Sequence, residues 1–308
     1  MEFLHFLEGI RFPALTEFML LITRLGEETA FLVIALIVFW CVDKYRGYYL
    51  LGVGLFGNLA NQFLKITCRV PRPWDRGFAF NAVEEAKAAA GGYSFPSGHT
   101  QTAFGTFGAI AATSKRKAVS AICIVLAVIV GISRMYLGVH TPSDVLVGAG
   151  MALAMVWLFQ YVMLGKGQRL IPVVFGVCLV LSAAFLAYVE FFPFPADLDA
   201  HNYESAVKNA YTFLGCFAGV LVVYFVDEKK LHFTTKAVWW AQILKTVFGL
   251  AAALAVKEGL RAPLEALFAG HMTARAVRYF LIVVVAGIVW PLTFRWFSKL
   301  GRKVEMTK

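Results

Sequence analysis

Long apolar runs recur along almost the whole chain, and they constrain its fold more than any other feature. Runs of roughly 16 to 24 residues are long enough for a helix to cross the hydrocarbon core of a bilayer, which is about 30 Å thick. Hydrophobic residues make up 59% of the 308 residues and charged residues only 16%, which is unlike a soluble globular domain. The sequence therefore predicts an all-α, polytopic membrane helical bundle. The predicted spans are residues 26–42, 47–68, 98–113, 118–136, 142–164, 170–190, 206–226, 237–257 and 277–298.

Basic residues gather in every second connection between these spans, which predicts the orientation of the chain. They are Lys44, Arg46, Lys115, Arg116, Lys117, Lys166, Arg169, Lys229, Lys230 and Lys236, followed by Arg295, Lys299, Arg302, Lys303 and Lys308 near the C-terminus. This side, including the C-terminus, is expected to be cytoplasmic, so the other connections face outward. The net charge of +10 is then explained without a nucleic-acid partner. The absence of any Asn-X-Ser/Thr sequence fits a bacterial inner (plasma) membrane.

Polar side chains form a stripe on the second predicted span. Asn58, Asn61, Gln62 and Lys65 recur at three- and four-residue spacing, so they share one helix face. Polar groups at membrane depth usually face a protein interior or a wet cavity. Arg72 follows seven residues after Lys65, in "KITCRVPRP". Taken alone, these two cations are explained as a snorkelling lysine and a solvated loop arginine.

The stretch "PSGH" stands at the start of the third predicted span. Ser97 is well placed as a helix N-cap, and Pro96 stiffens the turn before it. Gly98 is a poor helix former, but its missing Cβ would let backbone N–H groups approach a ligand closely. Since the amino end of a helix favours anions, His99 is expected to stand beside an anion site.

The stretch "SRMYLGVHTPSD" joins the fourth and fifth predicted spans. Arg134 ends the fourth span, and His140 and Asp144 flank the start of the fifth. Thr141 to Asp144 has the form of a capping box with proline at the first helical position, which gives Asp144 a structural role. The carboxylate of Asp144 is also four residues from His140, close enough to fix the imidazole tautomer and stabilise its protonated form.

These three stretches are expected to meet at the outer ends of the second to fifth spans. A cluster of three cations in such surroundings would be very unfavourable unless it encloses an anion. A phosphoryl group fits, because arginine binds its oxygens bidentately and lysine acts as a point charge. Two histidines then supply a nucleophile and a general acid.

Together the stretches resemble the three-part signature of the type 2 phosphatidic acid phosphatase superfamily. The matching residues are Lys65, Arg72 and Pro73, then Pro96 to His99, then Ser133, Arg134, His140 and Asp144. The resemblance covers roughly residues 26–165. It implies a PAP2-like catalytic membrane core in residues 26–190, with about six helices at typical span lengths. Residues 1–25 are expected to form interfacial helices, and residues 191–308 a C-terminal transmembrane extension of unknown role.

The resemblance implies a lipid phosphate phosphatase that hydrolyses a phosphomonoester at the outer membrane face. His140 is then the nucleophile that forms a phosphohistidine, Asp144 orients it, and His99 protonates the leaving alkoxide. The substrate phosphate is bound by Lys65, Arg72, Ser97, the Gly98 backbone and Arg134. No HExxH, paired-aspartate or EF-hand pattern is present, so the sequence predicts catalysis without a metal or cofactor.

Alternative functions remain open at this point. The same motifs suit an undecaprenyl pyrophosphate phosphatase, and in a different class an anionic-lipid transporter or binding protein would also need the cations. Lys245, in the middle of the span 237–257, would suit a transporter, although a snorkelling lysine explains it too. Gly52, Gly54 and Gly57 permit close helix packing, either within the bundle or between two copies of the chain.

Overall fold

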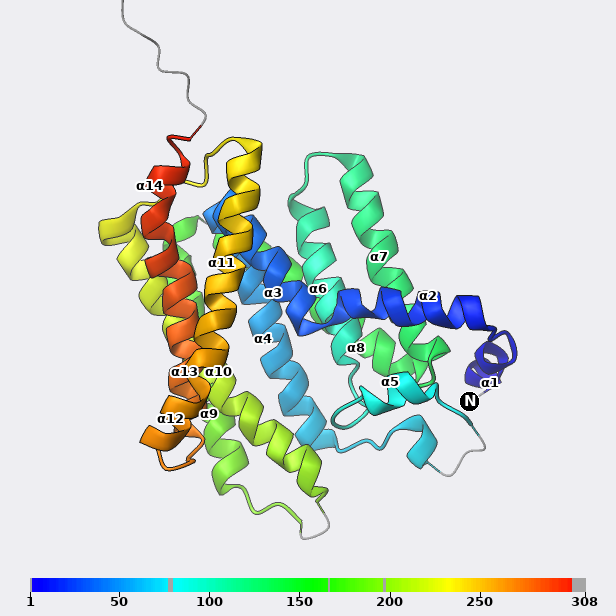
Figure 1. The fold of residues 1–308 in the computed structure, drawn as a ribbon. Helices are drawn as coiled ribbons and strands as arrows, with labels where there is room; N and C mark the ends of the chain where they lie inside the picture. Colours follow the sequence, from blue (N-terminus) through cyan, green and yellow to red (C-terminus); the bar gives the residue numbers. More distant parts are fainter. Residues whose placement is uncertain (1, 77–79, 166, 196–197, 301–308) are drawn as a thin grey trace, which may run out of the picture.

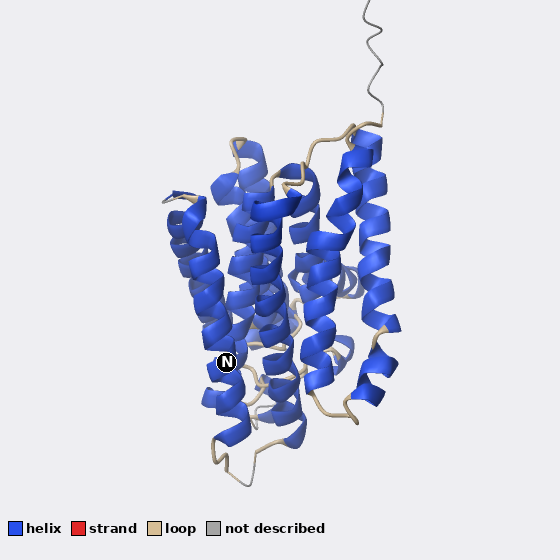
Figure 2. Cartoon of the chain, turned by 90° about the vertical axis from the view of Figure 1, so that its left-hand side faces the viewer, coloured by secondary structure: helices blue, strands red, loops and turns tan. Residues whose placement is uncertain are grey.

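A computed structural model describes residues 2–76, 80–165, 167–195 and 198–300, and all of its regular elements are helices (Figures 1 and 2). The all-α prediction is therefore confirmed. The α-helices are α1 (Glu2–Gly9), α2 (Pro13–Thr23), α3 (Glu28–Ile37), α4 (Lys44–Cys68), α5 (Glu84–Ala88), α6 (Gly98–Thr113), α7 (Lys117–Tyr136), α8 (Pro142–Phe159), α9 (Ile171–Phe191), α10 (Ala200–Val226), α11 (Trp239–Gly259), α12 (Arg261–Leu267), α13 (Thr273–Val284) and α14 (Phe294–Phe297).

Helix α4 is the centre of the bundle. On one side it packs against α6 and α8, and on the other against α9 and α10. Helices α6, α7 and α8 pack against one another, whereas α10 packs against α9 and α13 (Figure 1). One apolar core runs through both groups, so the region that carries the three motif stretches and the C-terminal helices are joined along α4. The division of the chain at residue 190 stays a prediction.

Six described helical segments are long and apolar enough to cross a membrane, or seven if α2 and α3 form one broken span bent by 55°. The segments that begin at α3, α4 and α6 are absent from the six, although each was predicted as a span. Helix α6 has only 16 residues, and the polar stripe of α4 lowers its mean hydropathy. Both helices lie inside the bundle, where polar groups face protein and not lipid.

The three glycines of α4 pack inside the bundle. A Cβ atom at Gly52 would approach the ring of Phe159, one at Gly54 would overlap Phe31, and one at Gly57 would overlap Gln101. The alternative left open by the sequence is thus resolved, because these contacts lie within a single chain. Close packing here brings α3 and α6 against the polar face of α4.

The interpretation of Lys245 as a snorkelling lysine is wrong. Its side chain is fully buried, and Nζ donates hydrogen bonds to the carbonyl oxygens of Trp40 at 2.7 Å and Thr235 at 3.1 Å. Nζ also lies 4.4 Å from the centroid of the Phe294 ring. Lys245 therefore ties α11 to the end of the α3 segment, and its ammonium group is used in these structural contacts.

Helix caps decide where the site-bearing helices begin. Ser97 caps α6 by accepting from the Thr100 N–H, and Thr141 and Asp144 form the predicted capping box of α8, with Pro142 in its first turn. Helix α4 ends at Cys68, where Arg69 adopts a left-handed conformation that stops the helix. These boundaries gather the three motif stretches at one end of the bundle, beside the segment that holds α5 (Figure 1).

Candidate active site

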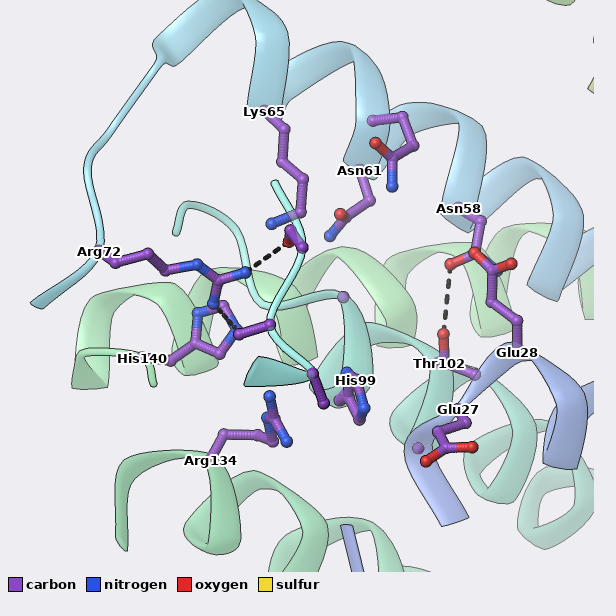
Figure 3. A pocket seen from close by; sticks show the side chains of 16 residues that line it. Glu27, Glu28, Asn58, Asn61, Lys65, Arg72, His99, Thr102, Arg134 and His140 are labelled. Carbon is purple, nitrogen blue, oxygen red and sulfur yellow. Dashed lines mark hydrogen bonds between the residues drawn. The ribbon is translucent and has the colours of Figure 1, made fainter. Parts of the chain in front are cut away.

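A cavity of about 200 Å³ lies where the three motif stretches meet (Figure 3). Six of the eight predicted site residues line it: Lys65, Arg72, Gly98, His99, Arg134 and His140. The other two, Ser97 and Asp144, are buried directly behind this lining. The structure therefore brings the predicted residues together, with the cations and His140 at the cavity wall and Asp144 supporting them.

Lys65 and the polar stripe of α4 form one wall of the cavity. Asn58, Asn61, Gln62 and Lys65 all line it, and all except Gln62 are buried. Nζ of Lys65 donates a hydrogen bond to the carbonyl of Tyr93, in the loop that precedes α6. Since an ammonium has three N–H donors, Lys65 keeps further donors for a bound anion.

Arg72 is held in one orientation by four hydrogen bonds. Its Nε donates to the carbonyl of Gly92 at 3.0 Å, and Nη2 donates to the carbonyl of Gly91 at 2.6 Å. Its Nη1 donates to the carbonyl of Val139 at 2.9 Å and also lies 3.0 Å from Nε2 of His140 (Figure 3). The guanidinium thus joins the loop after α5 to the loop before α8. Only a planar fork makes these contacts at once.

The contact with Arg72 defines the tautomer of His140. A guanidinium has only donors, so Nε2 of His140 must accept and the proton must lie on Nδ1. Burial, followed by the positive charge of Arg72, holds the pKa of His140 well below its usual value. A neutral imidazole is the form that acts as a nucleophile, once Nε2 exchanges the hydrogen bond from Arg72 for phosphorus.

Asp144 stands behind His140. Its Oδ2 lies 3.5 Å from Nδ1 of His140, an ion-pair distance at which the two atoms are not aligned as a hydrogen bond. The same oxygen accepts from the Ser94 hydroxyl at 2.6 Å and from the Thr141 backbone N–H at 2.8 Å. The capping role and the proximity to His140 therefore coexist in one carboxylate.

The amino end of α6 is fixed against α8. The Ser97 N–H donates to the carbonyl of Asp144 at 3.0 Å. A Cβ atom at Gly148 of α8 would lie only 2.7 Å from the carbonyl oxygen of Ser97, so glycine is needed for this approach. A Cβ atom at Gly98 would lie 3.6 Å from Oδ1 of Asn61, another residue that lines the cavity. At Gly98, in the first turn of α6, no side chain therefore lies between the backbone and the cavity.

Arg134 approaches from the last turn of α7. Its Nη1 donates to the hydroxyl of Thr23 at 2.7 Å, which ties the cavity to helix α2. Its Nε is buried and has no hydrogen-bond partner among the described residues. Arg134 itself lines the cavity, so its guanidinium lies near any anion bound there, and its phosphate-binding role stays a prediction.

The sequence did not single out Ser94, Thr23, Glu27 or Glu28. Ser94 supports Asp144, Thr23 supports Arg134, and the two glutamates line the cavity. In Figure 3 the glutamates lie on the side away from Arg72 and His140, with His99 between. Neither Ser94 nor residues 23–28 carry a local pattern that points to a site, because their contacts reach residues far away in the sequence.

The fold and the cavity define a membrane phosphatase, and comparison with known proteins agrees. A family model described as "PAP2 superfamily" matches residues 46–168. A second, "PAP2 superfamily phosphatase, transmembrane extension", matches residues 211–303. The chain belongs to the PAP2 superfamily.

One similar protein is phosphatidylglycerophosphatase B of Bacillus subtilis (strain 168). It is 36% identical over 164 residues, which cover 49% of this chain and 76% of the relative. No solved structure matches the chain. The predicted family and the predicted extension of the membrane domain are thus both confirmed.

Proposed function

We propose that this protein hydrolyses a lipid phosphomonoester at the outer face of the membrane through a phosphohistidine. The observation that carries the proposal is the arrangement around His140. His140 lines a cavity together with Lys65, Arg72 and Arg134, its Nε2 accepts from Arg72, and Asp144 lies behind its other nitrogen. A binding protein would need the cations, but it would not need an oriented neutral imidazole with a second histidine nearby.

In the first step, Nε2 of His140 attacks the phosphorus and the bond to the lipid oxygen breaks. His99 gives a proton to that oxygen, so the lipid leaves as an alcohol. Asp144 stabilises the positive charge that develops on the His140 ring. In the second step, His99 takes a proton from a water molecule, whose oxygen attacks the phosphorus and releases inorganic phosphate and His140.

Three cations and the amino end of α6 would hold the phosphoryl oxygens during both steps. Donors that are already in position stabilise the charge of the transition state without reorganisation. Among the described residues, no group of three or more His, Cys, Asp or Glu side chains is placed to hold a metal ion. We propose that Lys65, Arg72 and Arg134 supply the positive charge, so that the reaction needs no metal.

The position of the glutamates supports this assignment of roles. The phosphate would lie beside Arg72 and His140, while the repulsion of Glu27 and Glu28 keeps it from the far side of the cavity. The leaving oxygen would then point toward His99, which lies between the two groups in Figure 3. This is the position that a general acid requires.

Phosphatidylglycerophosphate is the substrate that we favour, because the similar Bacillus protein is a phosphatidylglycerophosphatase B. The runner-up is undecaprenyl pyrophosphate, whose terminal phosphate has the same shape. Lys44 begins α4, whose last turn carries Lys65, and Lys117 begins α7, whose last turn carries Arg134. These two members of the predicted cytoplasmic set therefore lie at the opposite helix ends from the cavity, which supports an outward-facing site in the bacterial inner membrane with the C-terminus in the cytoplasm.

The direct test is phosphate release by the purified protein in detergent, with excess chelator. We expect release from phosphatidylglycerophosphate or phosphatidic acid at an undiminished rate, because the charge is supplied by side chains. Undecaprenyl pyrophosphate in the same panel decides the runner-up. Loss of activity that returns with a divalent metal would contradict metal independence. A folded protein that releases phosphate from no lipid would favour a binding or transport function.

Gly98→Ala should leave the protein folded but slow it. The new methyl group makes only ordinary contact with Asn61, and alanine favours helix by up to about 1 kcal/mol, so the melting temperature should not fall. The methyl group would stand where phosphoryl oxygens approach the α6 backbone, so kcat/KM should drop roughly 10- to 100-fold, near the effect of losing one such donor.

Gly108→Ala is the matched control for this variant. It lies on the same helix, where a Cβ would meet Val156 at 3.4 Å, away from the cavity. Both variants are compared by thermal melting and by phosphate release. Equal activity of the two would show that the α6 backbone does not border the bound phosphate.

A further inference from the structure

We propose that a second, apolar cavity holds the hydrocarbon chain of the substrate, and that the C-terminal extension serves to build it. The inference rests on the proposed lipid phosphatase function. It assigns a role to α10, α11 and α13, which contribute no residue to the cavity around His140.

This second cavity, which we call the chamber, has a volume of about 450 Å³. One wall comes from α3 and α4, and the other from α10, α11 and α13, which lie side by side in Figure 1. Representative lining residues are Leu36, Leu55, Phe213, Val220, Leu250 and Ile282. Since the two walls come from the catalytic core and from the extension, neither part forms the chamber alone.

The chamber adjoins the cavity around His140. Glu28 and Asn58 line both. These two residues lie on the side of the site beyond His99, toward which the leaving oxygen of the substrate would point (Figure 3). A lipid with its phosphate beside Arg72 would therefore extend past His99 and Glu28 into the chamber.

The polarity of the chamber matches an amphiphile. Asn209, Thr212, Lys257 and Arg275 line it. Lys257 lies in the last turn of α11 and Arg275 in the first turn of α13, and these helix ends lie at the end of the bundle where α4 finishes (Figure 1). Arg275 is held there by hydrogen bonds to the Thr212 hydroxyl at 2.7 Å and to the carbonyl of Lys208 at 3.0 Å. These cations suit the polar ester or diester region of a lipid.

The remainder of the chamber is apolar and deep. It extends along α10 from Asn209 to Val223, which is about 20 Å at 1.5 Å per residue. This depth exceeds the hydrocarbon thickness of one leaflet, roughly 15 Å if the core is about 30 Å. A cavity that is polar at one end and apolar over such a length fits a lipid with a long hydrocarbon chain better than a small soluble ligand.

The chamber also has access from the bilayer. Leu32 of α3 and Leu254 of α11 both line it, yet they are 40% and 57% exposed. Because these two partly exposed leucines come from neighbouring helices, we place a lateral opening between α3 and α11. A chain can enter through it without leaving hydrocarbon, so entry costs little desolvation.

Photocrosslinking tests occupancy without relying on turnover. The probe is a palmitoyl phosphatidic acid analogue with a diazirine near the end of the chain, applied to the wild-type protein and to His140→Ala. We expect mass spectrometry to place adducts on chamber residues of α10, α11 and α13. Adducts confined to outward-facing residues such as Val247, which is 55% exposed, would overturn the proposal.

Filling the chamber tests its use in catalysis. Ala253→Trp should lower the ratio of kcat/KM for a palmitoyl substrate to that for a dihexanoyl substrate at least tenfold. Val247→Trp, on the outward face of the same helix, should leave this ratio unchanged. If the tryptophan prevents folding, the smaller Ala253→Leu gives the same comparison, with an expected fall of at least threefold.

An unchanged ratio in a folded chamber variant would overturn the proposal. If instead the wild-type protein hydrolyses neither substrate, the phosphatase function fails, while crosslinking still decides whether a chain occupies the chamber. The failures of the two proposals are thus distinguishable.

Discussion

Replacing His140 with alanine should lower phosphate release by on the order of 10⁴-fold or more, since loss of a covalent nucleophile removes the whole two-step route. The side chain is 2% exposed, lines the cavity, and accepts a hydrogen bond from Arg72 at Nε2. No other described histidine except His99 lines this cavity. The measurement is the single-turnover rate with phosphatidic acid, at equal concentrations of folded protein.

His99→Ala provides the contrast that separates nucleophile from general acid. We expect this variant to lose turnover of a lipid alkyl phosphate, whose leaving oxygen needs a proton. It should retain formation of the phosphoenzyme with an aryl phosphate, whose leaving group departs without one. His140→Ala should form no phosphoenzyme from either substrate.

Acid-labile, base-stable phosphate bound to the wild-type protein after rapid quenching would identify the phosphohistidine. The assignment of His140 would be wrong if the His140→Ala variant became labelled. It would also be wrong if His99→Ala were the only variant to lose the label with an aryl phosphate. Either result would exchange the two roles while leaving the cavity itself intact.

Much of the site was predictable because its residues lie at helix ends that have local signals. The capping box at Thr141 to Asp144 and the Ser97 cap define where α8 and α6 begin, and both signals depend only on nearby residues. The stripe from Asn58 to Lys65 shows which face of α4 turns inward. Once the spans alternate across a membrane, these ends must meet on one side.

The remaining features depend on contacts between distant parts of the chain. Thr23 reaches Arg134 across 111 positions, and the Lys245 side chain reaches the carbonyl of Trp40 across 205. No local pattern reports such pairs. The chamber was equally hidden, because a leucine that faces a cavity and one that faces lipid look alike in a sequence of apolar helices.

The predicted membrane spans agree less well with the structure where a helix is short or carries polar residues. Helix α4 is central in the bundle although its stripe lowers its mean hydropathy, and α6 is short because its first turn belongs to the site. In both helices the departure from an ordinary span occurs at residues that line the cavity around His140. In this chain, the helices that are too polar or too short for an ordinary membrane span are therefore those that carry the site.

Asp144→Asn should lower kcat by roughly 10²- to 10⁴-fold, the range expected when the charged partner of a catalytic histidine becomes neutral. The amide oxygen can replace Oδ2 as acceptor for Thr141 N–H and Ser94 hydroxyl, so the cap of α8 is kept. What is lost is the negative charge that stabilises the His140 ring when phosphorus is attached. The carboxylate also offsets the charge of Arg72, so some loss of thermal stability is expected, and rates must be compared at equal folded fractions.

Two neighbouring substitutions separate charge from packing at this position. Ser94→Ala removes one hydrogen bond to Oδ2 but keeps the carboxylate charged, so kcat should fall less than in Asp144→Asn, by about 10-fold for one lost bond to a charged group. Asp144→Ala removes both the charge and the cap, so it should match Asp144→Asn in kcat but melt at a lower temperature. If Asp144→Asn retained nearly full kcat while Asp144→Ala failed only in stability, the carboxylate would serve the capping box alone. The ring of His140 would then be stabilised by other groups of the cavity, and the orienting role assigned to Asp144 would be withdrawn.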